Sequence, residues 1–138
     1  MAEEELKMPK TKGKNSEHIR RIKKISLLFK KTVSTLMMDS PKEVLRIFEK
    51  GDEVPSIYSI GSLSTGIFSS KGQTKSTFIK SIIYLLNAIP HEYAMTIWKT
   101  YFIQCDTNWW KKYYSKSGYY RIRKKALEEI FEIADAEF

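Results

Sequence analysis

The sequence predicts an all-α protein, folded as a small bundle of five to six helices. Apolar residues recur at intervals of three and four over most of the chain, which is the period of one face of an α-helix. No stretch shows the apolar–polar alternation that is typical of a half-buried strand. Proline and glycine fall between the periodic stretches, where helices begin and end. We expect one domain over residues 16–138, preceded by a flexible basic arm over residues 1–15.

The composition is that of a small globular domain with an excess of positive charge. Of the 138 residues, 42% are hydrophobic, which is enough to bury a core, and the net charge is +8. The single cysteine, Cys105, excludes an intrachain disulfide framework. No window of 18 uncharged apolar residues is present, and the acidic start is unlike a secretory signal. We therefore expect a cytoplasmic protein that has no membrane contact, no cofactor and no metal, and that binds an anionic partner.

The first helix is predicted from about Glu17 to Met38, with Ser16 as its N-cap. Before it, the expected arm contains Pro9, Gly13 and four lysines and shows no apolar period. The basic residues of the helix lie mostly off its apolar stripe, so the stripe is expected to face the core. The stripe consists of Ile19, Ile22, Ile25, Phe29, Val33 and Leu36.

A short second helix is predicted to follow. Ser40 and Glu43 have the spacing of a capping box, and Pro41 stands at the first helical position, where proline is favoured. Gly51 is the expected glycine stop of this helix. The inner face is formed by Val44, Ile47 and Phe48.

A Ser/Gly-rich loop is predicted over residues 52–75, with a short helical turn at 58–63. The loop lacks the Gly-Lys-Ser/Thr order of a phosphate-binding Walker loop, so nucleotide binding is not expected there. A third helix, from about residue 74 to 88, is apolar around much of its girth. It is expected either to be central to the core or to cover a dimer seam. These elements make residues 16–89 an N-terminal platform.

Residues 90–138 are predicted to form three further helices. Pro90 begins the first, from His91 to about Gln104. A short helix is expected over residues 108–114, and a longer one from about Lys116 to Ala134, capped by Ser115 or, as the alternative, by Ser117. The core-facing stripe of the last helix consists of Tyr119, Ile122, Ala126, Ile130 and Ile133.

Charge is distributed in blocks along the chain. Ten basic residues and one acid lie between Lys7 and Lys31, and seven basic residues and one acid lie between Asp106 and Lys125. The last thirteen residues, 126–138, contain five acids and no base. A uniform solubilising surface would mix the two signs, so the second basic block, which is interleaved with aromatic residues, is a candidate interface for an anion.

A short helix, a tight turn and a longer helix with a basic N-terminal end form the arrangement of a DNA-binding helix-turn-helix. In that motif the longer helix enters the major groove by its N-terminal end, where long donors reach bases and phosphates. The acids that follow Leu127 would then lie away from the phosphates. The candidate DNA-binding residues are Lys111, Lys112, Lys116, Ser117, Tyr120, Arg121, Arg123, Lys124 and Lys125.

Residues 114 to 127 read Tyr-Ser-Lys-Ser-Gly-Tyr-Tyr-Arg-Ile-Arg-Lys-Lys-Ala-Leu. This segment resembles the second half of a sigma-factor region 4 helix-turn-helix, and is most similar to the small phage-type late-transcription regulators of the ArpU and RinA kind. The resemblance covers about residues 90–131. It implies that base- or phosphate-facing positions are occupied by Lys116, Ser117, Tyr120 and Arg121, and core positions by Tyr119, Ile122 and Ala126.

We therefore expect a non-enzymatic protein that binds double-stranded DNA and regulates transcription, with RNA polymerase and a second copy of the chain as further candidate partners. The alternative is an interaction module that docks on an acidic partner, such as RNA or the transcription machinery. A thiol enzyme would need Cys105 to meet His18 or His91 in space. The acidic residues near the C-terminus are expected to be solvent-facing and not a catalytic pair. The sequence predicts neither the target site nor the direction of regulation.

Overall fold

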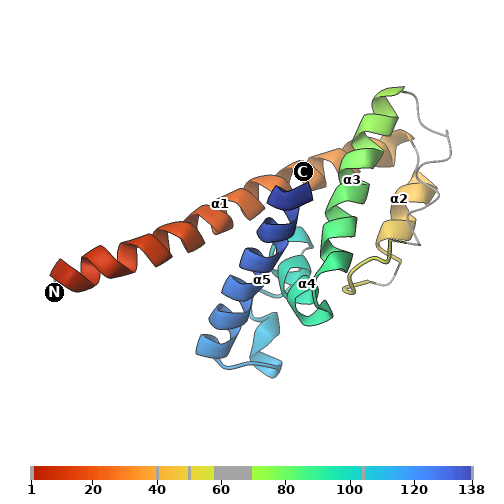
Figure 1. Cartoon of the computed structure of the whole chain (residues 1–138). Helices are drawn as coiled ribbons and strands as arrows, with labels where there is room; N and C mark the ends of the chain where they lie inside the picture. The colour runs from red at the N-terminus through yellow and green to blue at the C-terminus, as the bar shows by residue number, and fades with distance from the viewer. Residues whose placement is uncertain (1, 40, 50, 58–69, 104, 138) are drawn as a thin grey trace.

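The structure is a computed structural model in which residues 2–39, 41–49, 51–57, 70–103 and 105–137 are described (Figure 1). Within these residues all regular elements are helical, which confirms the predicted all-α class. The five α-helices are α1 (Ala2–Asp39), α2 (Pro41–Ile47), α3 (Ser70–Ala88), α4 (His91–Ile97) and α5 (Lys116–Glu137). A π-helix (Trp98–Phe102) continues α4, and one turn of 3-10 helix (Trp109–Lys112) precedes α5. No helix in this part of the chain has the length and apolar character needed to cross a bilayer.

The long helix α1 supports the rest of the bundle with its C-terminal half. Its predicted stripe is confirmed: Ile22, Phe29 and Leu36, which are seven residues apart, are almost fully buried. Ile19, Ile25 and Val33 are partly buried and pack against the same core. The N-terminal part of the helix extends beyond the other helices (Figure 1).

The predicted start of this first helix is wrong, because α1 begins at Ala2 and not near Glu17. Several residues at the start of the chain have high helix propensity, and the helix continues through Pro9 and Gly13. The mobility of the arm stays a prediction.

Helices α2 and α3 flank the C-terminal half of α1. Helix α2 ends at Ile47, and the chain turns through Gly51, whose φ of 67° is the left-handed conformation that glycine adopts most readily. Helix α3 begins at Ser70, so the predicted loop 52–75 is shorter than expected. The predicted turn at 58–63 and the candidate cap Ser40 lie outside the described residues.

Helix α3 is central to the core, as one of the two sequence interpretations proposed. Its buried apolar residues are Ile79, Ile82, Ile83, Leu85 and Leu86. Near its end, the side-chain amide of Asn87 donates to the carbonyl oxygens of Pro55 (2.9 Å) and Ile83 (2.8 Å). The Asn87 side chain thereby attaches the segment after α2 to the end of α3.

Helix α4 begins after Pro90, as predicted, but the α-helical part ends at Ile97. The next five residues form a π-helix, in which the amide of Ile103 donates to the carbonyl oxygen of Trp98 at 3.2 Å, five residues back. Trp98 is fully buried and touches aromatic rings from α1, from the turn after α2 and from its own helix. Trp98 is therefore the centre of the aromatic core.

Helix α5 packs mainly against α4 and also against α1 and α3. The predicted stripe is buried or partly buried, with Tyr119, Ala126 and Ile130 almost inaccessible to solvent. Leu127 and Phe131, which the predicted stripe omitted, are also buried. The buried face of α5 is therefore wider than a single stripe, because the helix contacts three neighbours.

Candidate nucleic-acid interface

The start of α5 is fixed by a serine cap. The hydroxyl oxygen of Ser115 accepts a hydrogen bond from the amide of Gly118 at 3.1 Å, and the Ser115 carbonyl accepts from the amide of Tyr119 at 2.8 Å. This is the N-cap arrangement, so the predicted cap Ser115 is confirmed over its alternative, Ser117. A side chain at position 118 would bring its Cβ to 3.0 Å from the Ser115 hydroxyl, which accounts for glycine there.

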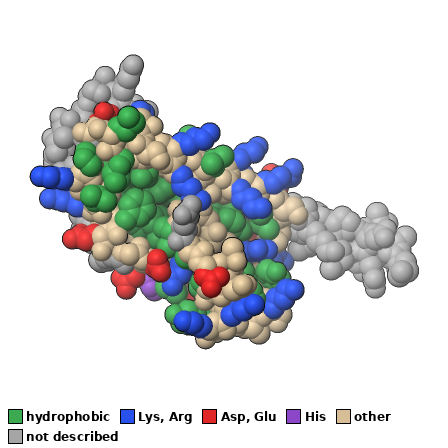
Figure 2. Space-filling view, turned by 180° about the vertical axis from the view of Figure 1, so that it is seen from behind, with side chains coloured by type: hydrophobic (Ala, Val, Ile, Leu, Met, Phe, Trp, Pro, Cys, Tyr) green, Lys and Arg blue, Asp and Glu red, His purple; other side chains and the backbone are tan. Residues whose placement is uncertain are grey.

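Most of the predicted DNA-binding side chains lie at this end of the molecule and are exposed. Lys124 and Arg123 are half-buried. Figure 2 shows Lys and Arg side chains at the lower end of the molecule, where Figure 1 places the start of α5 and the segment before it, and also at the left edge and along the upper right of the same face. The exposed members of the predicted set are Lys111, Lys112, Lys116, Ser117, Tyr120, Arg121 and Lys125.

The positive charge at the start of α5 is not neutralised by the protein's own acids. Within the described residues, none of the lysines and arginines of the predicted set forms a salt bridge. The salt bridge that α5 does form lies at its other end, where Asp135 Oδ1 is 2.8 Å from a guanidinium nitrogen of Arg21. A helix of 22 residues is about 33 Å long, so the two ends are electrostatically separate at physiological salt.

The C-terminal end of α5 is held to α1 by more than charge. The guanidinium carbon of Arg21 lies 4.1 Å from the ring centroid of Phe131, and the ring of His18 stacks on Phe131 at 5.1 Å. The hydrogen bond from Arg21 lowers the pKa of Asp135 and raises that of Arg21. One basic residue of the first block is thus paired within the protein, at the end of α5 opposite the candidate interface.

The basic end of α5 rests on a cluster of aromatic rings centred on Tyr119. The Trp110 ring stacks on it at 4.8 Å and 7°, and the Trp109 ring meets it edge to face at 5.8 Å. The Tyr119 hydroxyl is 2.8 Å from the Thr100 hydroxyl on the π-helix. The two tryptophans therefore pack against the protein, and they fix the segment before α5 to the helix that it precedes.

Two basic side chains near the start of α5 pack on aromatic rings, which the sequence did not predict. The guanidinium of Arg123 lies over the Tyr120 ring at 4.9 Å and near the Tyr119 ring at 5.8 Å, so it packs on the aromatic cluster. Lys99, which the sequence analysis missed, lies with its amine 5.3 Å from the Trp109 ring and 5.8 Å from the Tyr113 ring. The only sequence signal for Lys99 was that it is the one lysine or arginine in the predicted helix 91–104.

Exposed tyrosines and one acidic residue lie beside the basic side chains of the candidate interface. Tyr113 and Tyr120 are 62% and 44% exposed, respectively. The Tyr114 hydroxyl donates to Glu92 at 2.7 Å. Burial, followed by this hydrogen bond and the charge of Glu92, raises the pKa of Tyr114 to about 12. Tyr114 thus remains a neutral donor that attaches the segment before α5 to the start of α4.

The short helix predicted over residues 108–114 is wrong in length and type. Only Trp109–Lys112 is helical, and as one turn of 3-10 helix. The amide of Asn108 donates to the side chain of Asp106 at 3.0 Å, which forms a local turn just before the 3-10 helix. A helix-turn-helix with two α-helices joined by a tight turn is therefore not confirmed here.

The thiol of Cys105 is not arranged as a nucleophile. It donates to the carbonyl oxygen of Lys99 at 3.1 Å, and burial, with the nearby charges of Asp52 and Asp106, raises its pKa. An activated thiol needs a lowered pKa. Within the described residues, no group of three or more His, Cys, Asp or Glu side chains is placed to hold a metal ion.

No family model, curated protein or solved structure matches this chain.

Proposed function

We propose that this chain is a DNA-binding protein, a regulator of transcription, and that the N-terminal half of α5 enters the major groove of duplex DNA. The observation that carries the proposal is the cationic end of α5, which is exposed and unpaired, while Asp135 at the acidic end of the same helix is bound by Arg21. An α-helix fits the major groove, and its free first-turn amides add attraction for phosphate. This proposal does not depend on the short α-helix predicted over residues 108–114, where the chain forms one turn of 3-10 helix instead.

Within this proposal the side chains divide into two groups. Lys116, Ser117, Tyr120 and Arg121 lie on the first turns of α5, and these residues read bases or bind the phosphates that flank them. Arg123 orients the Tyr120 ring, on which its guanidinium is stacked. The phosphate-binding residues around this centre are Lys111, Lys112, Lys124 and Lys125.

Binding to duplex DNA as a function of salt tests the proposal. Neutralising several phosphates releases counterions, so the affinity for a mixed duplex should fall steeply from low to moderate salt. Arg121→Ala and Lys116→Ala should weaken binding further. Lys42→Ala, an exposed lysine on α2, should leave it unchanged. Absence of duplex binding at low salt would falsify the proposal.

The second candidate function, docking on an acidic partner such as RNA, is favoured by Tyr113 and Tyr120. Exposed aromatic rings beside cations are the means by which proteins stack on unpaired bases. Single-stranded RNA and duplex DNA can be compared in the same titration. Tighter binding of RNA, lost on Tyr113→Ala and Tyr120→Ala but not on Arg121→Ala, would replace the first function by the second.

The further partners also belong to this proposal. Paired half-sites are usual for proteins that insert a recognition helix, so we propose that the chain acts as a homodimer on DNA and, as a cytoplasmic regulator, contacts RNA polymerase. Sedimentation with and without a duplex measures the dimer directly. A one-to-one complex with every duplex tested would remove the dimer from the proposal and leave the α5 contact in place.

A further inference from the structure

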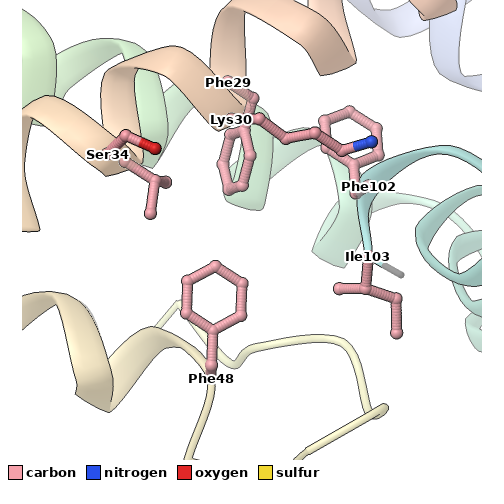
Figure 3. A pocket seen from close by; sticks show the side chains of 7 residues that line it. Phe29, Lys30, Ser34, Phe48, Phe102 and Ile103 are labelled. Atoms are coloured by element: carbon pink, nitrogen blue, oxygen red, sulfur yellow. The ribbon is translucent and has the colours of Figure 1, made fainter. Parts of the chain in front are cut away.

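A pocket lies away from the candidate interface, between the middle of α1, the turn after α2 and the end of the π-helix (Figure 3). Its volume is about 410 Å³, within the range of small-molecule sites. Most of the residues that line it are apolar. The lining consists of Phe29, Lys30, Val33, Ser34, Phe48, Phe102 and Ile103.

The apolar wall of the pocket belongs to the rigid part of the fold. Phe29 and Phe102 are only 1% and 3% exposed, and their rings meet edge to face at 5.2 Å. Trp98 supports both rings from the core side, at 5.8 Å and 5.7 Å, and stacks with Phe48 at 6.0 Å. A pocket with this backing is preformed, so a ligand would not have to order the side chains that receive it.

The polar groups of the pocket are few and stand on one element. Lys30 and Ser34 are neighbours on one face of α1, and both are exposed at the rim. Figure 3 shows the Lys30 amine extending toward Phe102, with the Ser34 hydroxyl on the other side of Phe29. Within the described residues, the Lys30 amine has no carboxylate partner and the Ser34 hydroxyl has no hydrogen-bond partner. The amine at the rim is thus free to bind an anionic group.

We infer that this pocket binds a small molecule that carries an apolar body and one carboxylate. The apolar body would cover the partly buried lining residues Val33, Phe48 and Ile103, and the carboxylate would accept from the Lys30 amine. A compact inorganic anion would leave these apolar side chains uncovered, and a neutral hydrocarbon would leave the amine unused. Another pocket, of about 390 Å³, does not share this pattern, because its lining includes Glu53 and Asn87.

Calorimetric titration of the full chain with matched probes tests this inference. The probes are 2-naphthoate, its neutral amide 2-naphthamide, and decanoate, which has the same carboxylate on a linear chain. Naphthoate should bind saturably and more tightly than the amide. If decanoate binds as tightly, the site takes linear-chain acids as well, and if it binds much more weakly, the natural ligand is aromatic. Either result supports the carboxylate site.

Substitutions on α1 test whether these compounds bind in the pocket. Lys30→Gln should weaken naphthoate by roughly two- to fivefold, as expected for an exposed ion pair, and leave the amide unchanged. The control is Lys31→Gln, the next residue, which is exposed but does not line the pocket. Ser34→Phe places a ring at an exposed rim position, where the core is not disturbed, and should block both compounds. Equal affinity for acid and amide, or equal effects of the two lysine variants, would overturn the inference.

Discussion

Ser115 determines where the basic end of α5 begins. The Ser115 hydroxyl accepts a hydrogen bond from the Gly118 amide. The Ser117 hydroxyl lies 3.5 Å from the Ser115 hydroxyl and caps no backbone amide of the described residues. Loss of an N-cap costs about 1 kcal/mol. Ser115→Ala should therefore lower the free energy of unfolding by about that amount in urea titrations. Ser117→Ala is the control and should change it by only a few tenths of a kcal/mol. Equal losses of unfolding free energy in the two variants would contradict the role of Ser115 as the cap.

Arg121 and Lys112 have different roles if the α5 end reads DNA. Replacing Lys112, a phosphate contact, should weaken all duplexes about equally and reduce the salt slope by roughly one unit. Replacing Arg121 should cost about 1–3 kcal/mol, mainly on the preferred sequence. Binding to a preferred and a scrambled duplex at several salt concentrations measures both effects. If the two variants behave alike, no base is read.

Residue placement was predictable where one local rule decides it. The cap at Ser115 follows from the residues that open α5, and the exposure of Lys116 and Arg121 follows from the apolar period of that helix. Lys99 and Arg123 could not be placed in this way. Their positions depend on rings of Trp109 and Tyr120, which the fold brings into contact with them.

At the scale of elements, the contact between α1 and α5 responds to pH. Arg21 lowers the pKa of Asp135 in the folded state, so the contribution to stability is present above the unfolded pKa of about 3.9 and is lost as pH falls through the lower folded value. The stability difference between the native protein and Asp135→Asn should therefore be constant near neutrality and vanish in acid. Urea unfolding over this pH range measures it.

A matched control for this contact is available on the same helix. Glu132 is exposed and has no salt bridge within the described residues, so Glu132→Gln should show no such pH-dependent difference. Arg21→Ala should be more damaging than Asp135→Asn, because it also removes the guanidinium from the Phe131 ring. Identical acid profiles for the two acid variants would contradict the assigned role of Arg21.

Helices were predictable from periodicity, but their ends and types were less so. Helices α3 and α5 were placed by apolar spacing, yet α3 begins about four residues before its predicted start, because Ser, Gly and Gln are weak indicators of a loop. The π-helix was not predictable, since a wide turn and an α-turn both place Trp98 and Phe102 in the core. The single 3-10 turn in place of the helix predicted over residues 108–114 was not predictable from the apolar period either.

At the scale of the whole molecule, Trp98 joins three parts of the fold. It is fully buried and contacts rings of α1, of the turn after α2 and of the π-helix. Trp98→Ala should cost about 3–5 kcal/mol of unfolding free energy, because it leaves a cavity at that junction. Trp109→Ala is the comparison and should cost less, since Trp109 is only half-buried. Chemical unfolding of both variants decides the order.

The overall class and the separation of charge were predictable from the sequence, because each depends on patterns spread over many residues. The blocks of like charge correctly indicated that the start of α5 is basic and its end acidic. Which acid pairs with which base was not predictable, since Arg21 and Asp135 are 114 residues apart. The pocket beside Lys30 was missed for the same reason: its wall is assembled from three distant segments.

The π-helix also constrains the length of the chain. Each residue of an α-helix turns the chain by about 100°. A π-turn spends about one residue more on each turn than an α-turn does, so deleting one residue within Trp98–Phe102 would restore an ordinary turn and leave the following segment nearly unrotated. Inserting one residue there would instead rotate that segment relative to α4 by about 100°, so that Thr100 could no longer meet Tyr119 while Ile103 still borders the pocket. We therefore expect a single deletion to be tolerated better than a single insertion at this position.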